Sequence, residues 1–314
     1  MIINLILQLP ITVHITFVCI SIQAMVHSLR QRFIRLVFLH SLRVADVNND
    51  NKPDIIVSNT GSGNIGILFN TGNGTFLSQS TYTSGMVGRL FSVIDINTDN
   101  KPDIVVPNAS GTSAWILFNT GNGSFLSQAN YPIGVDPHAS IVVDVNSDNK
   151  LDIVVSNTNW NNVGVLLNTG TGTFQPQITY STGIRPLFID VGDVNRDGKP
   201  DIVVPNASSS NIGILFNIGN GTFLPQITYA TTSSPQHTVI TDVNGDNIPD
   251  IVVTLSTTVG IFLNAGNGTF LPEISYATGV GPHYVAAVDV NGDNKPDLIT
   301  TNYNSHTISV LLHV

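Results

Sequence analysis

The sequence is poor in cysteine, in charge and in glutamate. Its single cysteine, Cys19, lies in an apolar N-terminal stretch, so the rest of the chain cannot form an internal disulfide framework. Charged residues make up only 11% of the 314 residues, and the formal net charge is −9. The chain has no Lys/Arg patch of the kind that nucleic acid requires. A disulfide-stapled domain and a nucleic-acid-binding protein are therefore excluded.

Two further absences concern secondary structure and catalysis. No segment shows a sustained 3.6-residue apolar period, which favours an all-β fold. The sequence has no Gly-x-Ser-x-Gly elbow, no catalytic cysteine and no His-Glu-x-x-His motif, and the lone glutamate, Glu273, has no evident partner for acid–base work. We therefore expect that the protein is not an enzyme.

The N-terminal residues carry the longest apolar runs. Ile2 to Leu9 and Ile15 to Ile22 are followed by Gln23-Ala24 and then by several arginines, which predicts a signal peptide over 1–24 and a single domain over 25–314. The alternatives are an uncleaved membrane anchor, since a span needs about 20 apolar residues, and a truncated upstream repeat. Beyond residue 37 no stretch of the sequence could cross a membrane.

An acidic loop of nine residues recurs six times along the chain. The first copy reads Asp46-Val-Asn48-Asn-Asp50-Asn-Lys-Pro-Asp54, and the others begin at Asp95, Asp144, Asp193, Asp242 and Asp289. The first five copies start 49 residues apart, and the last starts 47 residues after its predecessor. Of the 20 Asp residues 18 lie in these loops, as do all five Lys residues, so the acidity belongs to the loops. A fixed period of this length indicates a repeat architecture.

Each repeat reads as four short strands joined by tight turns. In the copy that contains Asp193, strands are expected over 186–192, 201–205, 212–217 and 222–229, with the Asn-Gly turn at 219–221 supplying the positive φ values of a hairpin. Four short strands repeated every 40–50 residues are typical of a β-propeller blade. The sequence therefore predicts an all-β propeller.

The ends of the chain predict how the propeller closes. An aromatic residue lies 13 positions before the loops of repeats two to six, and the same offset before Asp46 falls on Phe33. Residues of about 27–35 are therefore expected to be a spare fourth strand, while the sixth repeat stops after its third strand, His306 to Leu312. Pairing the two would close six four-stranded blades and remove exposed strand edges.

The loop has the composition of a calcium site. Positions 1, 3, 5 and 9 are Asp, Asn, Asp and Asp in every copy, position 7 would contribute a backbone carbonyl, and position 6 is Asn or Gly, which tolerate a left-handed turn. Oxygen donors without His or Cys suit Ca²⁺ and disfavour zinc and copper. Asx turns without metal are the alternative. We expect up to six structural Ca²⁺ ions, held by Asp46, Asn48, Asp50, Lys52, Asp54, Asp95, Asn97, Asp99, Lys101, Asp103, Asp144, Asn146, Asp148, Lys150, Asp152, Asp193, Asn195, Asp197, Lys199, Asp201, Asp242, Asn244, Asp246, Ile248, Asp250, Asp289, Asn291, Asp293, Lys295 and Asp297.

The combined pattern resembles a known repeat. D-x-N-x-D-x-x-P-D-I-V-V, followed by N-x-G-I-L-F-N and N-G-T-F, is similar to the FG-GAP/VCBS repeat of integrin α-subunit propellers, some fungal lectins and many secreted or surface proteins. The resemblance covers about residues 27–314 and implies that the loop joins the first two strands of a blade and binds calcium. Integrin function proper does not follow, because every blade here carries the loop and the other ectodomains of an integrin are not seen.

Candidate ligand-binding and glycosylation residues lie outside the loops. Six positions before each loop, the starts of the innermost strands should gather at the face opposite the calcium loops, where they could bind a sugar or an anionic group or simply line a polar channel: His40, Arg89, His138, Leu187, Gln236 and His283. Six N-glycosylation sequons are present: Asn73, Asn108, Asn122, Asn206, Asn220 and Asn267. Asn108 and Asn206 are expected to be the better acceptors, because turn geometry alone explains the other four.

These observations lead to one main functional hypothesis and three others. The main one is a secreted or cell-surface adhesion and recognition scaffold that binds a protein or glycan partner, with membrane attachment only if residues 1–24 remain as an anchor. A lectin with repeated sugar sites is the second. A calcium-dependent propeller of a polysaccharide lyase is disfavoured, because no Lys lies outside the loops. A degenerate gene product without an independent role is the fourth.

Overall fold

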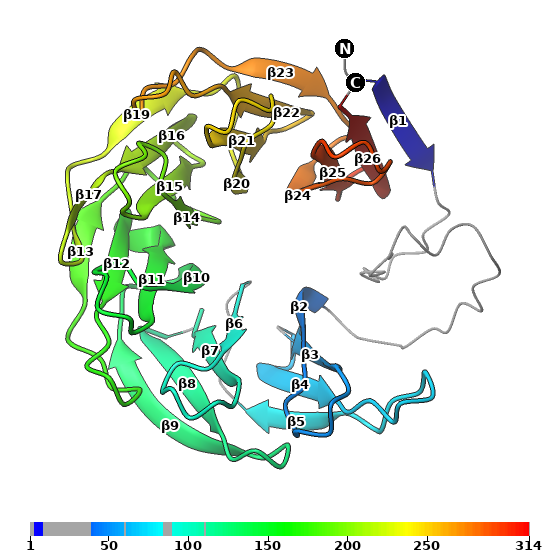
Figure 1. The fold of residues 1–314 in the computed structure, drawn as a ribbon, viewed down its shortest axis with the longest axis vertical. Coiled ribbons are helices and arrows are strands. Elements are labelled where there is room, and N and C mark those ends of the chain that lie inside the picture. The colour runs from blue at the N-terminus through cyan, green and yellow to red at the C-terminus, as the bar shows by residue number, and fades with distance from the viewer. Residues whose placement is uncertain (1–2, 9–38, 60, 84–89, 110, 314) are drawn as a thin grey trace.

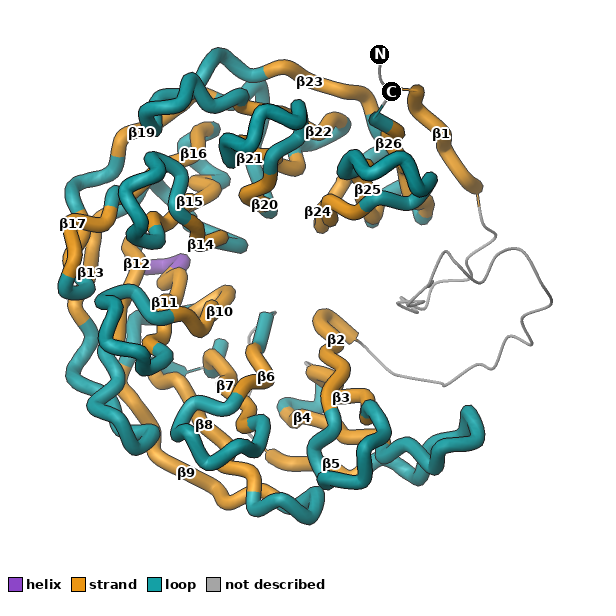
Figure 2. The backbone as a smooth tube through the Cα atoms, in the orientation of Figure 1, coloured by secondary structure: helices purple, strands orange, loops and turns teal. Residues whose placement is uncertain are grey.

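The computed structural model describes residues 3–8, 39–59, 61–83, 90–109 and 111–313. These residues form an all-β structure of six four-stranded antiparallel sheets arranged around a common centre (Figure 1). In each sheet three strands that are consecutive in sequence lie side by side, with the first of them nearest the centre. Figure 2 shows the loops that connect these strands. Within the described part of the chain, no helix has the length and apolar character needed to span a bilayer.

The first three sheets follow the repeats in order. The first contains β2 (Leu39–Ala45), β3 (Asp54–Asn59), β4 (Asn64–Leu68) and β5 (Ser80–Thr83). The second contains β6 (Ser92–Ile94), β7 (Asp103–Pro107), β8 (Ser113–Asn119) and β9 (Phe125–Pro132). The third contains β10 (Pro137–Val143), β11 (Asp152–Asn157), β12 (Asn162–Leu166) and β13 (Ile178–Ser181), with the 3₁₀ turn η2 (Thr158–Trp160) between β11 and β12.

The other three sheets repeat the arrangement with two changes. The fourth contains β14 (Asp190–Gly192), β15 (Asp201–Asn206), β16 (Asn211–Leu215) and β19 (Ile227–Ala230), beside the small hairpin of β17 (Asn217–Gly219) and β18 (Thr222–Phe223). The fifth contains β20 (Thr238–Thr241), β21 (Asp250–Thr254), β22 (Thr258–Phe262) and β23 (Ile274–Ala277). The sixth contains β24 (Pro282–Val288), β25 (Asp297–Asn302), β26 (Thr307–Leu312) and β1 (Ile3–Gln8).

An N-terminal strand does complete the sixth sheet, but it is not the predicted one. β1 pairs antiparallel with β26, from Ile3 opposite Leu312 to Gln8 opposite Thr307. The predicted segment of about 27–35 lies outside the described residues. β1 lies inside the predicted signal peptide, which stays a prediction. The six paired residues of β1 supply hydrogen-bond partners to the main-chain groups at the open edge of β26. Any extended segment could do the same, because main-chain hydrogen bonds do not depend on side-chain identity.

The hydrophobic core is divided among the seams between neighbouring sheets. Strands such as β11 are buried on both faces, with Ile153 and Val155 packed against the second sheet and Val154 against the fourth. Separate buried clusters join each consecutive pair of sheets from the first to the sixth. The face of the first sheet that points away from the second carries its own cluster around Val57 and Leu68, and the described residues show no cluster shared by the first and sixth sheets.

Polar side chains fasten the same seams. The Asn168 amide nitrogen donates to the Ile96 carbonyl of the preceding sheet over 2.9 Å. The Tyr131 hydroxyl donates to the carbonyl of Gly172 in the next hairpin, and the Tyr131 ring packs edge-on against Phe174 with centroids 5.1 Å apart. The tyrosine series noted in the sequence therefore marks contacts between neighbouring sheets.

Candidate functional site

Each acidic loop folds around its first aspartate. In the first copy, Asp46 Oδ1 accepts the amides of Asn48 and Asp50, and Asp46 Oδ2 accepts the amide of Asn51 at 2.7 Å. Asn51 has φ of 60°, as position 6 was predicted to be left-handed, and position 4 is left-handed too, with φ of 62° at Asn49. The two left-handed residues curl the loop so that successive amides point at one carboxylate.

The ninth residue of the loop is a buried structural hub. Asp54 is fully buried, and its two oxygens accept the amide of Val47 in the loop and the amide of Asn70 after the third strand, at 3.1 and 2.8 Å. The five counterparts make the same two bonds. This carboxylate therefore ties the start of the second strand of each sheet to the end of the third.

Burial makes these carboxylates hard to ionise without a cation. Burial, helped by the neighbouring loop carboxylates, raises the pKa of Asp54 and Asp250, and raises that of Asp103, Asp152 and Asp201 to about 6, against two backbone hydrogen bonds that lower it. A cation bound in the loop would offset the cost of ionising the buried carboxylate. The oxygen donors of the loop are of the kind that bind such a cation.

The remaining carboxylate of the loop faces a lysine in four copies. Lys52 Nζ lies 3.2 Å from Asp50 Oδ2, and the same pair recurs in the next three loops. In the fifth and sixth loops an amide takes that place, with Asn244 Nδ2 donating to Asp246 and Asn291 Nδ2 donating to Asp293. The aspartate at position 5 therefore pairs with a lysine in the first four loops and accepts a hydrogen bond from an asparagine amide in the last two.

The acidic loop offers a set of oxygen donors for a divalent cation. Carboxylate, amide and main-chain oxygens at positions 1, 3, 5, 7 and 9 are the ligands that Ca²⁺ prefers. The side chains turn their oxygens toward loop amides and the lysine, and among the described residues no three carboxylate, imidazole or thiolate groups converge to hold a metal ion. The residue types fit calcium, and binding would require the carboxylates at positions 1 and 5 to exchange hydrogen bonds with loop amides and the lysine for contacts with the ion.

The predicted ring of ligand residues is only partly assembled. His138 and His283 both approach the Phe188 ring, with centroids 4.5 and 5.6 Å away. Leu187 is buried, and Gln236 donates its side-chain amide to Ser234 Oγ. His40 lies in β2, and Arg89 lies outside the described residues.

The centre is filled by residues that the sequence reasoning missed. Phe188, His237 and Tyr284 lie one position after the predicted ring and contact one another at 4.9–5.7 Å between centroids. Burial, together with the nearby His283 and Arg43, lowers the pKa of His237 to about 3. The His237 Nδ1 atom is buried and has no hydrogen-bond partner among the described residues. This arrangement makes an aromatic plug rather than an open polar channel.

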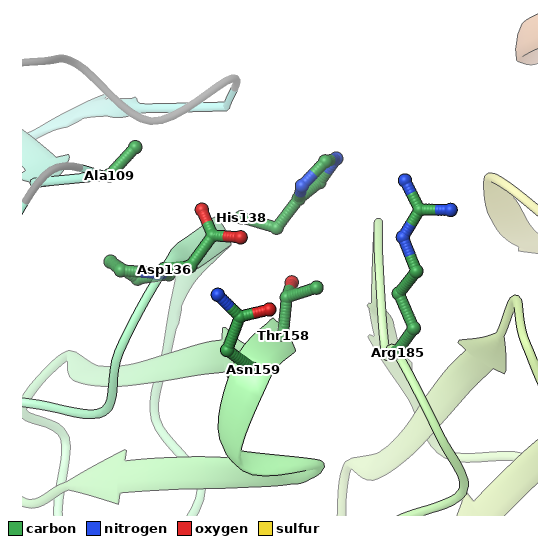
Figure 3. A pocket seen from close by; sticks show the side chains of 7 residues that line it. Ala109, Asp136, His138, Thr158, Asn159 and Arg185 are labelled. Atoms are coloured by element: carbon green, nitrogen blue, oxygen red, sulfur yellow. The ribbon is translucent and has the colours of Figure 1, made fainter.

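A pocket opens beside this plug, at the seam of the third and fourth sheets. The seam pocket has a volume of about 310 Å³, and it is lined by residues of the third and fourth repeats together with Ala109 of the second: Ala109, Asp136, Pro137, His138, Thr158, Asn159 and Arg185. Figure 3 shows the carboxylate of Asp136 beside Asn159, with the guanidinium of Arg185 on the other side. The pocket lies at the start of β10, whereas the acidic loop follows its end, so pocket and loop occupy opposite ends of the third sheet.

The sequons behave differently from the expectation. Asn108 and Asn206 are buried, and Asn206 Nδ2 donates to Asn211 and Gln226, so neither is available to a glycosyltransferase in the folded protein. Asn206 ends β15, and its side-chain amide holds the following turn through Asn211. Asn108 lies just after β7, and its backbone amide donates to the Ser113 carbonyl. The four hairpin sequons are exposed: Asn73, Asn122, Asn220 and Asn267. The turn that explains their sequence also exposes them.

Solved structures with the same fold come from several functional classes. One is an Agrocybe aegerita lectin described as recognising non-reducing terminal N-acetylglucosamine, with 20% identity, a TM-score of 0.59 and coverage of 83% of this chain and 74% of the lectin. Another, from Desulfotomaculum acetoxidans, is described as functionally unknown, with 15% identity, a TM-score of 0.62 and coverage of 82% and 78%. A third is a catalytically inactive virginiamycin B lyase from Staphylococcus aureus with quinupristin, with 14% identity, a TM-score of 0.58 and coverage of 88% and 80%. At these identities the likeness shows the fold alone.

Sequence comparison identifies the repeat itself. None of the curated proteins is a significant match. The profile described as FG-GAP-like repeat matches residues 46–106, 95–155, 144–204 and 242–300, which together make up more than half of the chain. Each match begins at the first aspartate of an acidic loop and runs into the next repeat. The chain therefore belongs to the FG-GAP-like repeat family.

Proposed function

We propose that this chain is a calcium-stabilised, six-bladed propeller that acts outside the cell or at its surface as a non-catalytic recognition scaffold. The observation that carries the proposal is the acidic loop, repeated six times with one hydrogen-bond pattern and with oxygen donors at the same positions. Sites of modest affinity would fill at extracellular calcium concentrations, roughly 10⁻⁴–10⁻³ M for extracellular modules.

Calcium would be held by the side chains at positions 1, 3, 5 and 9 and by the carbonyl at position 7. When bound, the ion supplies positive charge to three carboxylates that otherwise repel one another. The chain's own contribution is the rigid hub of position 9, since Asp152 already links the start of β11 to Asn168 after β12. Metal binding in each loop would thus stiffen the two central strands of its sheet.

The partner is proposed to be a glycan or a protein bound at the end of the sheets opposite the acidic loops. Support comes from the seam pocket at that end and, for a glycan, from the lectin among the structural neighbours. A non-catalytic role is supported by the one glutamate: Glu273 accepts hydrogen bonds from the Thr232 amide and hydroxyl at 2.9 and 2.8 Å and lies half-buried just before the outermost strand of the fifth sheet.

A thermal melt in a calcium titration tests the scaffold. The full chain is melted in EGTA, in magnesium and in increasing calcium, and we expect a calcium-specific rise in the midpoint that saturates between sub-millimolar and millimolar concentrations. A midpoint that calcium leaves unchanged would reduce the loops to Asx turns and remove the main support for an extracellular role. A glycan array with the calcium form then separates a glycan partner from a protein partner.

A further inference from the structure

We propose that the seam pocket binds one acidic sugar residue, a pyranose-sized ring that carries a carboxylate and several hydroxyls. This inference rests on the proposed recognition function and names the ligand class for it. Its basis is the pocket's own chemistry: a guanidinium on one side, and a carboxylate beside an amide on the other, around a volume of about 310 Å³ (Figure 3). That volume is at the lower end of the range for small-molecule sites.

The two charged residues occupy backbone positions that favour glycine. Asp136 and Arg185 lie eight residues before their loops and have φ of 54° and 63°, while Gly281 takes the same position in the sixth repeat with φ of 70°. Their carbonyls accept equivalent bonds, from Thr158 N to Asp136, from Ala207 N to Arg185 and from Tyr303 N to Gly281. The main chain is therefore the same in all three repeats, and only two of them bear the strain of a side chain there.

Strained side chains of this kind are informative when they meet at one cavity. A left-handed conformation disfavours residues other than glycine, but Arg196 also adopts it, so the shared pocket and not the strain alone points to use of these two side chains. Asp136 and Arg185 come from neighbouring repeats, and both line the same pocket. Neither forms an ion pair within 4.0 Å with any described residue, so both charges remain available to a ligand.

Arg185 selects the anionic group of the ligand. Its guanidinium presents a planar fork of N–H donors that matches a carboxylate in two parallel hydrogen bonds. The Arg185 side chain is exposed and lies across from Asp136 and Asn159 (Figure 3). A carboxylate is thus the group that this side of the pocket recognises best.

The opposite side suits hydroxyl groups. The Asp136 carboxylate accepts hydrogen bonds, and the neighbouring Asn159 amide both donates and accepts them. Hydroxyls, which are donors and acceptors at once, match this mixture, whereas an ammonium group would find no use for the amide's donors. A ring with a carboxylate at one end and hydroxyls at the other satisfies both sides.

The pocket is held in shape before any ligand enters. Thr158 Oγ1 donates to the carbonyl of Pro186 across the seam at 2.8 Å, and the Arg185 amide donates to Asn161 Oδ1 at 2.9 Å. These bonds join the wall from η2 to the segment that carries Arg185. A preformed wall loses little conformational entropy on binding.

The same chemistry does not recur at the next seam. One period later, His138, Thr158 and Asn159 are replaced by Leu187, Ala207 and Ser208, and the first two of these replacements are buried apolar residues. The acidic loops repeat six times, but this pocket depends on residues of one seam. The expected stoichiometry is therefore one acidic sugar per chain, in contrast to a lectin with a site in every blade.

Calorimetry on the full chain in calcium tests the assignment. The probes are glucuronic acid, N-acetylneuraminic acid, glucose and N-acetylglucosamine, and we expect one site that binds at least one of the acids about tenfold or more tightly than the neutral sugars. Whichever acid binds more tightly identifies the source as a uronic-acid or a sialic-acid glycan. Arg185→Gln should weaken acid binding about tenfold, whereas Arg196→Gln, at the same φ of 63° in the same repeat, should not.

A second variant separates binding from folding. Arg185→Gly restores the residue that this backbone favours, so acid binding should be lost while the melting midpoint stays level or rises. The proposal is overturned if neither acid binds at millimolar concentration, if neutral sugars bind equally well, or if Arg185→Gln binds like the unaltered chain. Glycan binding that survives Arg185→Gln would exclude this site but keep the proposed recognition function. Acid binding by a protein whose stability does not depend on calcium would keep this site but exclude the calcium-stabilised scaffold.

Discussion

Individual side chains in this protein carry opposite responses to pH. Three of the ninth residues, Asp103, Asp152 and Asp201, have a pKa raised to about 6, so in metal-free protein they favour the folded state in acid and lose that contribution as pH rises from about 3.8 to about 6. His237 has a lowered pKa, so the unfolded chain binds its proton first, and stability is lost as pH falls from about 6.5 toward about 3. The two effects overlap and partly cancel.

Replacing His237 isolates its contribution to the pH dependence of the free energy of unfolding. His237→Phe keeps a ring among Phe188 and Tyr284 but removes the titration, so unfolding free energy measured with urea in EGTA should fall less between pH 7 and pH 4 than in the unaltered chain. One titrating group contributes at most about 1.4 kcal/mol per pH unit. His306→Gln, an exposed histidine, is the control and should leave the pH dependence unchanged. Parallel pH curves for His237→Phe and the unaltered chain would rule out a buried neutral imidazole.

At the scale of the hairpin, the second glycine of the turn also touches the preceding sheet at Gly123, Gly172, Gly221 and Gly268, whereas a Cβ added at Gly74 would have open space. Gly172 has φ of 71°, and a Cβ added there would lie 2.6 Å from the Phe118 ring of the second sheet and 3.2 Å from Asn97 Cβ. The hairpin therefore needs glycine twice, once for its own backbone and once for the neighbour that it touches.

Substitution at this turn should cost more than the backbone term alone. Gly172→Ala is expected to lower the unfolding free energy by about 1–3 kcal/mol, because the left-handed penalty is joined by a clash with Phe118. Gly245→Ala is the matched control, since Gly245 has φ of 80° and open space around its Cβ position. Urea midpoints of the two variants in EGTA give the comparison. Equal losses would show that the seam contributes nothing at this point.

Short sequence motifs correctly predicted the strands whose ends are set by neighbouring residues in the sequence. Asp loops and Asn-Gly turns bound the strands, and in the fourth repeat the expected strand 201–205 is β15 almost residue for residue. The expected strand 222–229 divides into β18 and β19 at Leu224 to Gln226, where Pro225 has no amide hydrogen for a ladder bond. The expected strand 186–192 shortens to β14.

The residues at the centre and in the pocket could not be found in the same way. A register shift between Pro137 and Ala139, repeated between Pro282 and Tyr284, breaks the alternation of the innermost strands, so that positions five and six before the loop both approach Phe188. Asp136 and Arg185 are a full period apart and meet only through the packing of two sheets. The one available signal was the contrast with Gly281 at the same place in the repeat.

At the scale of the whole molecule, closure depends on the first and sixth sheets. Contacts between innermost strands run from β2 through β6, β10, β14 and β20 to β24. Arg43 on β2 is close enough to Tyr284 on β24 for the phenol to offset part of the burial that lowers the pKa of Arg43. This interaction links one side chain of the first sheet with one of the sixth, which supports the closed six-bladed arrangement proposed above.

The N-terminal strand gives closure a direct test. If β1 is part of the mature fold, deleting residues 1–24 leaves β26 as an exposed edge, and an exposed edge invites pairing between chains. The deletion should then lower the urea midpoint, at on the order of 1 kcal/mol per backbone hydrogen bond lost, and should shift the protein toward oligomers in size-exclusion chromatography.

The opposite result would favour secretion with cleavage. A chain of residues 25–314 that is monomeric and as stable as the full chain would mean that β26 needs no help from Ile3–Gln8, leaving the segment near 27–35 free to complete the sixth sheet as the tyrosine register predicts. Mass spectrometry of the exported protein then fixes its first residue. A mature protein that begins after Ala24 cannot contain β1, so the strand and the signal peptide are competing uses of one segment, and the two measurements together decide between them.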